Sequence, residues 1–348
     1  VYKRQPDAYI SKELFDDYKV KYNYPRKGEV MITCAGTVGK CVVYDGEDAY
    51  FQDSNIVWID NPTQYISNGF LFHLLSKVDW RKLNSTTIIR IYNDDLRNLK
   101  MSYPRKEEQQ KISHLLSLLD ERIATQNKII EDLKKLKSAI IEKTFNENYS
   151  NKIRLRDVGS YIRGLTYSSD DVVESNGIFV MRSNNIINGS SLDYHNNIVS
   201  VNKQILTEQQ LQTGDIVICM ANGSSSLVGK SSFYDGDCST PITVGAFCGI
   251  YRSKEPIVKW LFQTNKYRRY IWNSLQGGNG AIANLNGDDI LRMSFSIPAT
   301  PAKDNRIKLL TSVDTLLESN ISLCDLYISQ KLYLLRPVSY THLPSPRD

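Results

Sequence analysis

A long stretch near the middle of the chain has the repeat of a coiled coil, and this feature most constrains the fold. Within residues 104–145, apolar side chains recur in alternating steps of three and four, at Ile112, Leu116, Leu119, Ile123, Ile130, Leu133 and Ile140. This spacing places them along one seam of a helix. Only Gln126 and Lys137 interrupt the seam. At 1.5 Å per residue the helix would extend roughly 50–60 Å. It is too long for the interior of a compact domain and is therefore expected to be a spacer.

A second helical seam near the end of the chain supplies a partner for the first. Residues 306–336 carry apolar side chains at heptad spacing, interrupted by Asn320 and Lys331. One such helix alone would be equally well explained as ordinary bundle core. Two long ones separated by a whole domain favour an intramolecular helix pair. The residues expected to pair the helices are Leu116, Leu119, Ile123, Ile130, Leu133, Leu310, Val313 and Leu317.

The segments that precede the two helices repeat each other. KGEVMI at residues 27–32 matches TGDIVI at residues 213–218. Residues 39–46 likewise match residues 229–236, and residues 93–104 match residues 287–298. The separation between the copies grows from 186 to 194 residues, so the copies differ by small loop insertions. The plan is therefore globule, helix, globule, helix.

The predicted fold class is α+β: two similar mixed α/β globules separated by two long antiparallel coiled-coil helices. Short β-branched runs after glycine turns predict strands at residues 29–33, 40–44, 215–220 and 231–234, and residues 70–78 and 257–275 are expected to be helical. The expected boundaries are residues 1–104, 105–146, 147–298 and 299–336 for globule, central spacer, globule and distal spacer. The first globule lacks a counterpart of residues 151–186, which predicts truncation at the N-terminus. Residues 337–348 have no period and are expected to be a non-native tail.

Composition bounds the class of protein. The chain has 348 residues, of which 41% are apolar and 23% charged, as in a globular protein with two or three domains. No apolar run approaches the length of a membrane span. Six scattered cysteines without a C-x-x-C pair predict reduced thiols, a cytoplasmic location and no zinc site. The net charge of +5 permits a nucleic-acid partner without requiring one.

The repeated plan resembles the specificity subunit of type I restriction–modification enzymes. The likeness is carried by MSYP at residues 101–104 leading into EQQKI at residues 108–112, and by RLRDV at residues 154–158 at the start of the second globule. It covers nearly the whole chain apart from the tails. TPAKDNR at residues 300–306 departs from the pattern because it lacks the Glu-Gln pair.

The resemblance implies that each globule is a target-recognition domain that reads one half of a split target on double-stranded DNA. The helix pair would fix the separation of the domains, and its outer face would seat two methyltransferase subunits, with restriction subunits as further partners. The chain itself would hold no cofactor, and S-adenosylmethionine would be bound by the methyltransferase.

The loop at residues 221–231, ANGSSSLVGKS, nearly spells a Walker A phosphate loop. That motif has four residues between its glycines, whereas Gly223 and Gly229 enclose five, and a strand is expected where the motif requires a helix. Small residues and the charge of Lys230, or of Lys40 in the first copy, would suit a DNA-facing loop. A plain surface hairpin is an equally good reading.

Basic and amide side chains supply further candidate contacts. Arg and Asn have the bidentate geometry that suits base edges, and Lys and Arg suit phosphates. Any one of these side chains is also explained as solvated surface. The loop at residues 277–280, GGNG, would enter a groove or form a simple turn. The candidate DNA contacts are Lys40, Arg163, Tyr167, Arg182, Asn184, Asn185, Asn222, Ser224, Lys230, Lys266, Arg268 and Asn279.

The sequence does not favour a catalytic role for the chain. It has four scattered histidines, no Asn/Asp-Pro-Pro-aromatic methyl-transfer signature, and adjacent acids at residues 94–95 and 288–289 that suit turns and helix caps. Two alternatives stay open. One is a coiled-coil scaffold whose globules bind protein without DNA, and the other is an enzyme with a degenerate phosphate loop.

Overall fold

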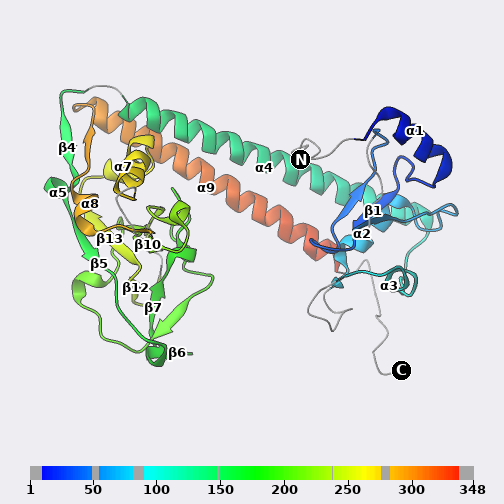
Figure 1. The fold of residues 1–348 in the computed structure, drawn as a ribbon, viewed down its shortest axis with the longest axis horizontal. Helices are drawn as coiled ribbons and strands as arrows, with labels where there is room; N and C mark the ends of the chain where they lie inside the picture. The colour runs from blue at the N-terminus through cyan, green and yellow to red at the C-terminus, as the bar shows by residue number, and fades with distance from the viewer. Residues whose placement is uncertain are drawn as a thin grey trace. The chain divides into compact units, whose positions relative to one another are not determined.

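The structure is a computed structural model, and it describes residues 10–48, 55–80, 90–146, 149–236, 238–275 and 283–336. The chain divides into two compact units, residues 1–130 with 319–348 and residues 131–318. Each unit contains one globule and parts of two long helices, α4 (Lys106–Phe145) and α9 (Ala302–Leu335) (Figure 1). The division therefore falls inside both helices, and each globule has helical segments of its own.

The globule of the first unit is a small antiparallel sheet covered by a helix. Its elements are α1 (Lys12–Lys21), β1 (Val30–Thr33), β2 (Cys41–Val43), β3 (Ile56–Trp58), α2 (Asn68–Lys77) and α3 (Asn93–Arg97). The strand order is β2-β1-β3. Alternate residues of β1 are buried, and Val30 and Ile32 pack in one cluster with Leu71 and Leu75 of α2.

The globule of the second unit contains two larger sheets. The first has the antiparallel order β11-β9-β13-β5, and the second has the order β12-β7-β8-β6 with β12 and β7 parallel. The strands are β4 (Lys152–Arg154), β5 (Gly159–Arg163), β6 (Val172–Val173), β7 (Ile178–Met181), β8 (Val199–Val201), β9 (Ile216–Cys219), β10 (Ala221–Asn222), β11 (Ser231–Phe233), β12 (Ile242–Val244), β13 (Cys248–Ser253), β14 (Ala283–Asn284) and β15 (Ser294–Ser296). The helices are α5 (Leu155–Val158), α6 (Val258–Leu261), α7 (Asn265–Leu275) and α8 (Gly287–Leu291). Two strand pairs, β10-β14 and β15-β4, complete the globule.

The two globules are built alike, as the internal repeat predicted. The order β2-β1-β3 matches β11-β9-β13, because β1 is the copy of β9 and β2 the copy of β11. Equivalent glycines adopt the same left-handed backbone: Gly28 (φ 90) matches Gly214 (φ 92), and Gly39 (φ 82) matches Gly229 (φ 80). Residues with a Cβ rarely adopt this conformation, so the repeated glycines set repeated turns. The predicted α+β class is confirmed.

Residues 257–275 differ from the single helix that was predicted. They form two helices, α6 and α7, with a break between them. The Thr264 hydroxyl donates to the Leu261 carbonyl (2.7 Å) and accepts from the Tyr267 N–H (3.1 Å), so one side chain ends the first helix and starts the second. Helix α1 and the sheet that contains β12 were not predicted.

Helices α4 and α9 run antiparallel wherever they meet within a unit. In the first unit Asp120 contacts Lys331, and Gln126 contacts Asn320. In the second unit Lys137 contacts Asp314. The residue numbers of the contacting partners therefore decrease along α9 as they increase along α4, as in an antiparallel pair. Leu116, Leu119, Ile130, Leu310, Val313 and Leu317 are buried, and Ile123 and Leu133 are half-buried. The predicted coiled-coil pairing is confirmed. None of the helices in the described part of the chain is long and apolar enough to cross a membrane.

Candidate nucleic-acid interface

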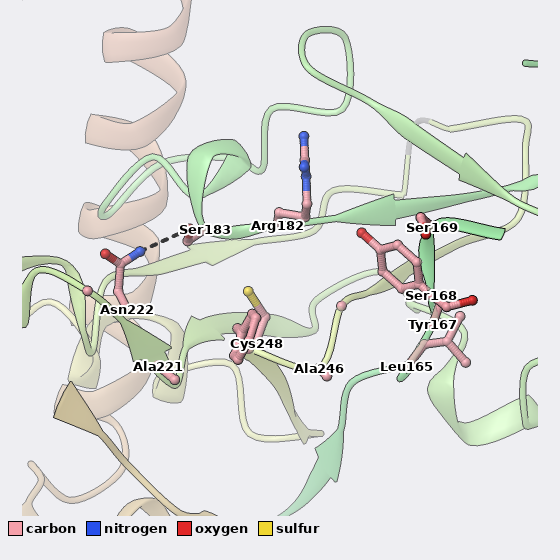
Figure 2. A pocket seen from close by; sticks show the side chains of 13 residues that line it. Leu165, Tyr167, Ser168, Ser169, Arg182, Ser183, Ala221, Asn222, Ala246 and Cys248 are labelled. Atoms are coloured by element: carbon pink, nitrogen blue, oxygen red, sulfur yellow. Dashed lines mark hydrogen bonds between the residues drawn. The ribbon is translucent and has the colours of Figure 1, made fainter. Parts of the chain in front are cut away.

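A cavity of about 570 Å³ opens on the second unit where β7, β10 and the turn before β13 come together (Figure 2). It brings together three of the predicted DNA contacts, Tyr167, Arg182 and Asn222. Figure 2 shows Asn222 and Tyr167 on opposite sides of Cys248 in this view. The remaining wall is mostly apolar or small, and it includes Phe247. A few polar groups over apolar walls are typical of a binding site.

Arg182 is held at the mouth of this cavity by its neighbour Asn185. The chain leaves β7 at Arg182, whose backbone N–H donates to Asn185 Oδ1 (2.9 Å). Asn185 Nδ2 donates in turn to the carbonyls of Asp193 (3.0 Å) and Asn196 (2.8 Å). The backbone is thereby fixed while the guanidinium of Arg182 stays exposed.

The structure does not support the predicted DNA contact of Asn185. Its side chain is 0% exposed, and both polar atoms are used in hydrogen bonds within the globule. A buried amide that is fully bonded stabilises its own fold rather than a ligand. The preceding residue, Asn184, is exposed and stays a candidate contact.

Asn222 is oriented from both ends of its amide. Its Nδ2 donates to Ser183 Oγ (3.2 Å), which Figure 2 marks, and its Oδ1 accepts from the Ser224 N–H (3.0 Å). Ser224 is itself exposed, with its hydroxyl 2.8 Å from that of Ser226. The loop therefore presents an ordered set of small polar groups beside Arg182.

The thiols near the cavity are unreactive. Burial raises the pKa of Cys248 far above its ordinary range, and burial also raises the pKa of Cys219. Both stay protonated near neutral pH, and only a thiolate is a good nucleophile. The cavity thus offers a positive charge, amide and hydroxyl hydrogen bonds, and aromatic faces.

A second groove, of about 520 Å³, lies on the other side of the same loop. Lys230, Arg268 and the exposed Trp272 line it, together with Ser225 and Ser226. Asn222 and Gly223 line the first cavity, so the loop at residues 221–230 borders both. Basic side chains beside an exposed aromatic ring suit a nucleic-acid backbone.

Gly229 fixes the path of this loop. A Cβ at this position would lie 2.7 Å from Ile271 Cγ1, and the Tyr267 hydroxyl donates to the Gly229 carbonyl (2.8 Å). The strand β11 follows at once, as expected, so the segment does not have the helix that a Walker A loop requires.

Three other candidates among the described residues, Lys266, Arg163 and Lys40, line neither depression. Lys266 sits 5.7 Å from the ring centroid of Phe295, and Arg163 is exposed at the end of β5. Lys40 is exposed in the first unit. Asn279 lies outside the described residues. The structure therefore gathers Tyr167, Arg182, Asn222, Ser224, Lys230 and Arg268 around one loop, and it does not test whether any of them touches DNA.

A buried carboxylate joins the second globule to the helix pair. Asp314 of α9 accepts from Lys137 (2.7 Å) on α4, Lys259 (2.8 Å) on α6 and the Trp260 indole (3.3 Å). Burial acts to raise the pKa of Asp314, but the two ammonium groups outweigh it and hold this pKa below the ordinary value. Lys137 also donates to the Gly189 carbonyl (2.8 Å), so the same network reaches the globule.

The first unit contains the repeat copy of this ion pair. Lys331 and Asp120 are each 194 residues from Lys137 and Asp314, and they pair with each other. Gln126 and Asn320 are also copies of one another, and the Gln126 amide donates to the Asn320 carbonyl (3.2 Å). Every polar interruption of the two seams is thus matched by a polar partner on the facing helix.

No group of three or more His, Cys, Asp or Glu side chains able to hold a metal ion is found among the residues that the structure describes.

Comparisons with known proteins agree with the fold. Residues 2–135 match the family model of the type I restriction modification DNA specificity domain. A protein of Haemophilus influenzae with the provisional name type I restriction enzyme specificity subunit S.HindORF215P is 47% identical over 130 residues, which are 37% of this chain and 33% of that protein. The EcoKI specificity subunit of Escherichia coli is 34% identical over 173 residues, which are 46% of this chain and 34% of that protein.

A solved structure agrees with these matches. The chain resembles the S subunit of the type I restriction–modification system of M. genitalium, with a TM-score of 0.57 and 14% identity over 92% of this chain and 85% of that one. The first part of the chain, residues 2–135, thus matches a type I restriction modification DNA specificity domain. Its matches span about a third of the length of the curated relatives. The identity to the solved structure is low, so that likeness describes the fold alone.

Sequence reasoning missed several residues of the candidate interface and of the helix pair. Phe247 and Trp272 are exposed aromatic rings beside the two depressions, and no local spacing marks them. Asp120 and Asp314 were also missed, although a signal for them existed. Their separation of 194 residues equals the repeat offset, and each faces a lysine that interrupts a seam.

Proposed function

We propose that the chain is the DNA-recognition subunit of a type I restriction–modification enzyme. Each globule reads one half of a bipartite duplex target. The paired helices fix the separation between the two half-sites that are read. The chain performs no catalytic step. Two methyltransferase subunits bind S-adenosylmethionine and transfer its methyl group. Restriction subunits are further partners. All act in the cytoplasm.

The observation that carries the proposal is the meeting of Arg182, Asn222 and Tyr167 at one cavity, in a chain whose residues 2–135 match a type I restriction modification DNA specificity domain. Arg pairs in a bidentate manner with guanine and Asn with adenine. Lys230 and Arg268 on the other side of the loop would hold phosphates. The net charge of +5 favours the same partner.

Binding of duplexes tests the proposal, with the target found by mapping methylated sites in cells that carry this gene and its methyltransferase. We expect Arg182→Ala to lower the preference for the target over a scrambled duplex by about 5–150-fold. Arg268→Ala should weaken both duplexes alike and reduce the salt slope by about 1. Arg292→Ala is the control, because that side chain is exposed and already paired with Asp289 (3.2 Å). Binding that is unchanged between about 50 and 200 mM salt would contradict the proposal.

A protein-binding scaffold is the second candidate, because exposed leucines recur along both helices. It predicts protein partners without duplex binding, and the same titration separates the two functions.

A further inference from the structure

Phe247 is displayed on the surface by a rigid turn. Its side chain is 69% exposed, although the residues on either side of the turn, Gly245 and Cys248, are buried. The Phe247 carbonyl accepts from the N–H groups of Met220 (2.8 Å) and Ala221 (3.1 Å). The Gly245 N–H donates to the Met181 carbonyl (2.8 Å). The ring is therefore held outward by a backbone tied to two neighbouring strands.

The neighbours of Phe247 indicate what the ring meets. It lines the cavity that also contains Arg182, Tyr167 and Asn222. A guanidinium attracts phosphate, an amide bonds a base edge, and aromatic rings stack on base faces. Proteins that bind the minor groove frequently insert apolar side chains such as Phe between base steps and partly unstack them. The mostly apolar cavity of about 570 Å³ beside the ring has room for the face of a displaced base.

We propose that Phe247 inserts into one base step of the half-site read by the second globule, and that a base unstacked by it lies against the cavity beside Arg182. The inference rests on the proposed function, because it requires duplex binding. It adds a specificity element to that function: steps that unstack easily, such as pyrimidine–purine steps, are favoured at the position of Phe247.

The test uses the full chain with its methyltransferase and the mapped target duplex, with 2-aminopurine placed in turn at each position of the half-site. We expect its fluorescence to rise at one position when wild-type protein binds. Phe247→Ala should abolish the rise and weaken target binding by about tenfold, within the range for loss of one base stack. Phe247→Trp should retain the rise. Leu206→Ala is the matched control, because this apolar side chain of the same unit is 63% exposed, lines neither depression and should leave the signal intact.

The outcomes separate the inference from the proposed function. The insertion of Phe247 is overturned if the complex forms on the target without a fluorescence rise at any position, or if the rise survives in Phe247→Ala. Either result leaves the proposed DNA recognition unaffected. Failure of the wild-type protein to bind any duplex overturns both. Loss of the rise in Leu206→Ala as well as Phe247→Ala also overturns the insertion of Phe247, because the signal would then not depend on this ring.

Discussion

Asn184 and Asn185 are adjacent in the chain, but they have opposite environments. Asn184 is exposed, whereas Asn185 is 0% exposed and its amide joins Arg182 to the carbonyls of Asp193 and Asn196. Composition and residue type do not distinguish the two. Only the turn that follows β7 decides which side chain points inward, so the fate of each asparagine depends on contacts distant in sequence.

Asn185→Ala is expected to destabilise the second unit. It removes three hydrogen bonds made by a buried side chain, so the free energy of unfolding should fall by about 2–3 kcal/mol. Urea unfolding measures the change. Asn184→Ala is the control and should alter stability by less than about 0.5 kcal/mol. Equal stability of the two variants would show that the buried network contributes nothing.

At the level of elements, local patterns were predictable and long-range pairings were not. The seam of α4 depends on spacing within one helix, and the strands β1 and β9 follow from repeated glycine turns. The sheet β12-β7-β8-β6 was missed because the parallel pairing of β7 with β12 joins segments far apart in the chain. The cavity beside Arg182 follows from that pairing, since Arg182 directly follows β7 and Phe247 follows β12.

The polar residues of the helix seams specify how the helices pair. An antiparallel pair of leucine seams can slip by one heptad at little cost, whereas a buried polar residue tolerates only a register that gives it a partner. Gln126 meets Asn320, and Lys137 meets Asp314. A slip would leave a buried carboxylate beside apolar side chains, which is strongly unfavourable.

Asp314→Asn should therefore destabilise the second unit at neutral pH by about 3–5 kcal/mol, because Lys137 loses its buried counter-charge. The pKa of Asp314 lies below its ordinary value of 3.8 in the folded chain. The contribution of its charge is thus complete above the unfolded-state pKa and is lost as the pH falls through the lowered folded-state pKa. The difference between wild type and variant should shrink over that acid range in unfolding experiments.

Asp132→Asn provides the control for this prediction. Asp132 forms an exposed pair with Lys135 (3.6 Å), and such pairs contribute less than about 1 kcal/mol. A gap between wild type and Asp314→Asn that stays constant into acid would show that the charge of Asp314 is not the source of its effect.

At the scale of the whole molecule, the helices carry more apolar surface than their own pairing uses. Leu309, Leu316 and Leu323 recur every seven residues on α9 and are 41%, 50% and 38% exposed. Leu115, Ile129 and Leu136 on α4 are also exposed, and each directly precedes a residue of the seam or one of its polar interruptions. Recurrent exposed leucines on a helix mark an interaction surface. They are the surface on which the proposed methyltransferase subunits would dock.

Leu316→Asp is expected to weaken association with the methyltransferase by at least about tenfold, since a charge in an apolar contact is costly to desolvate. Co-purification and titration of the two proteins measure the loss. The side chain is half exposed in the chain alone, so the variant should fold and still bind the target duplex. Ser322→Asp, an exposed position about 120° around α9 from Leu316, adds the same charge on another face of the helix and should leave association unchanged. If both variants associate as the wild type does, the subunits dock elsewhere. If Leu316→Asp loses duplex binding as well, its effect lies in the fold of the helix pair rather than in a docking surface.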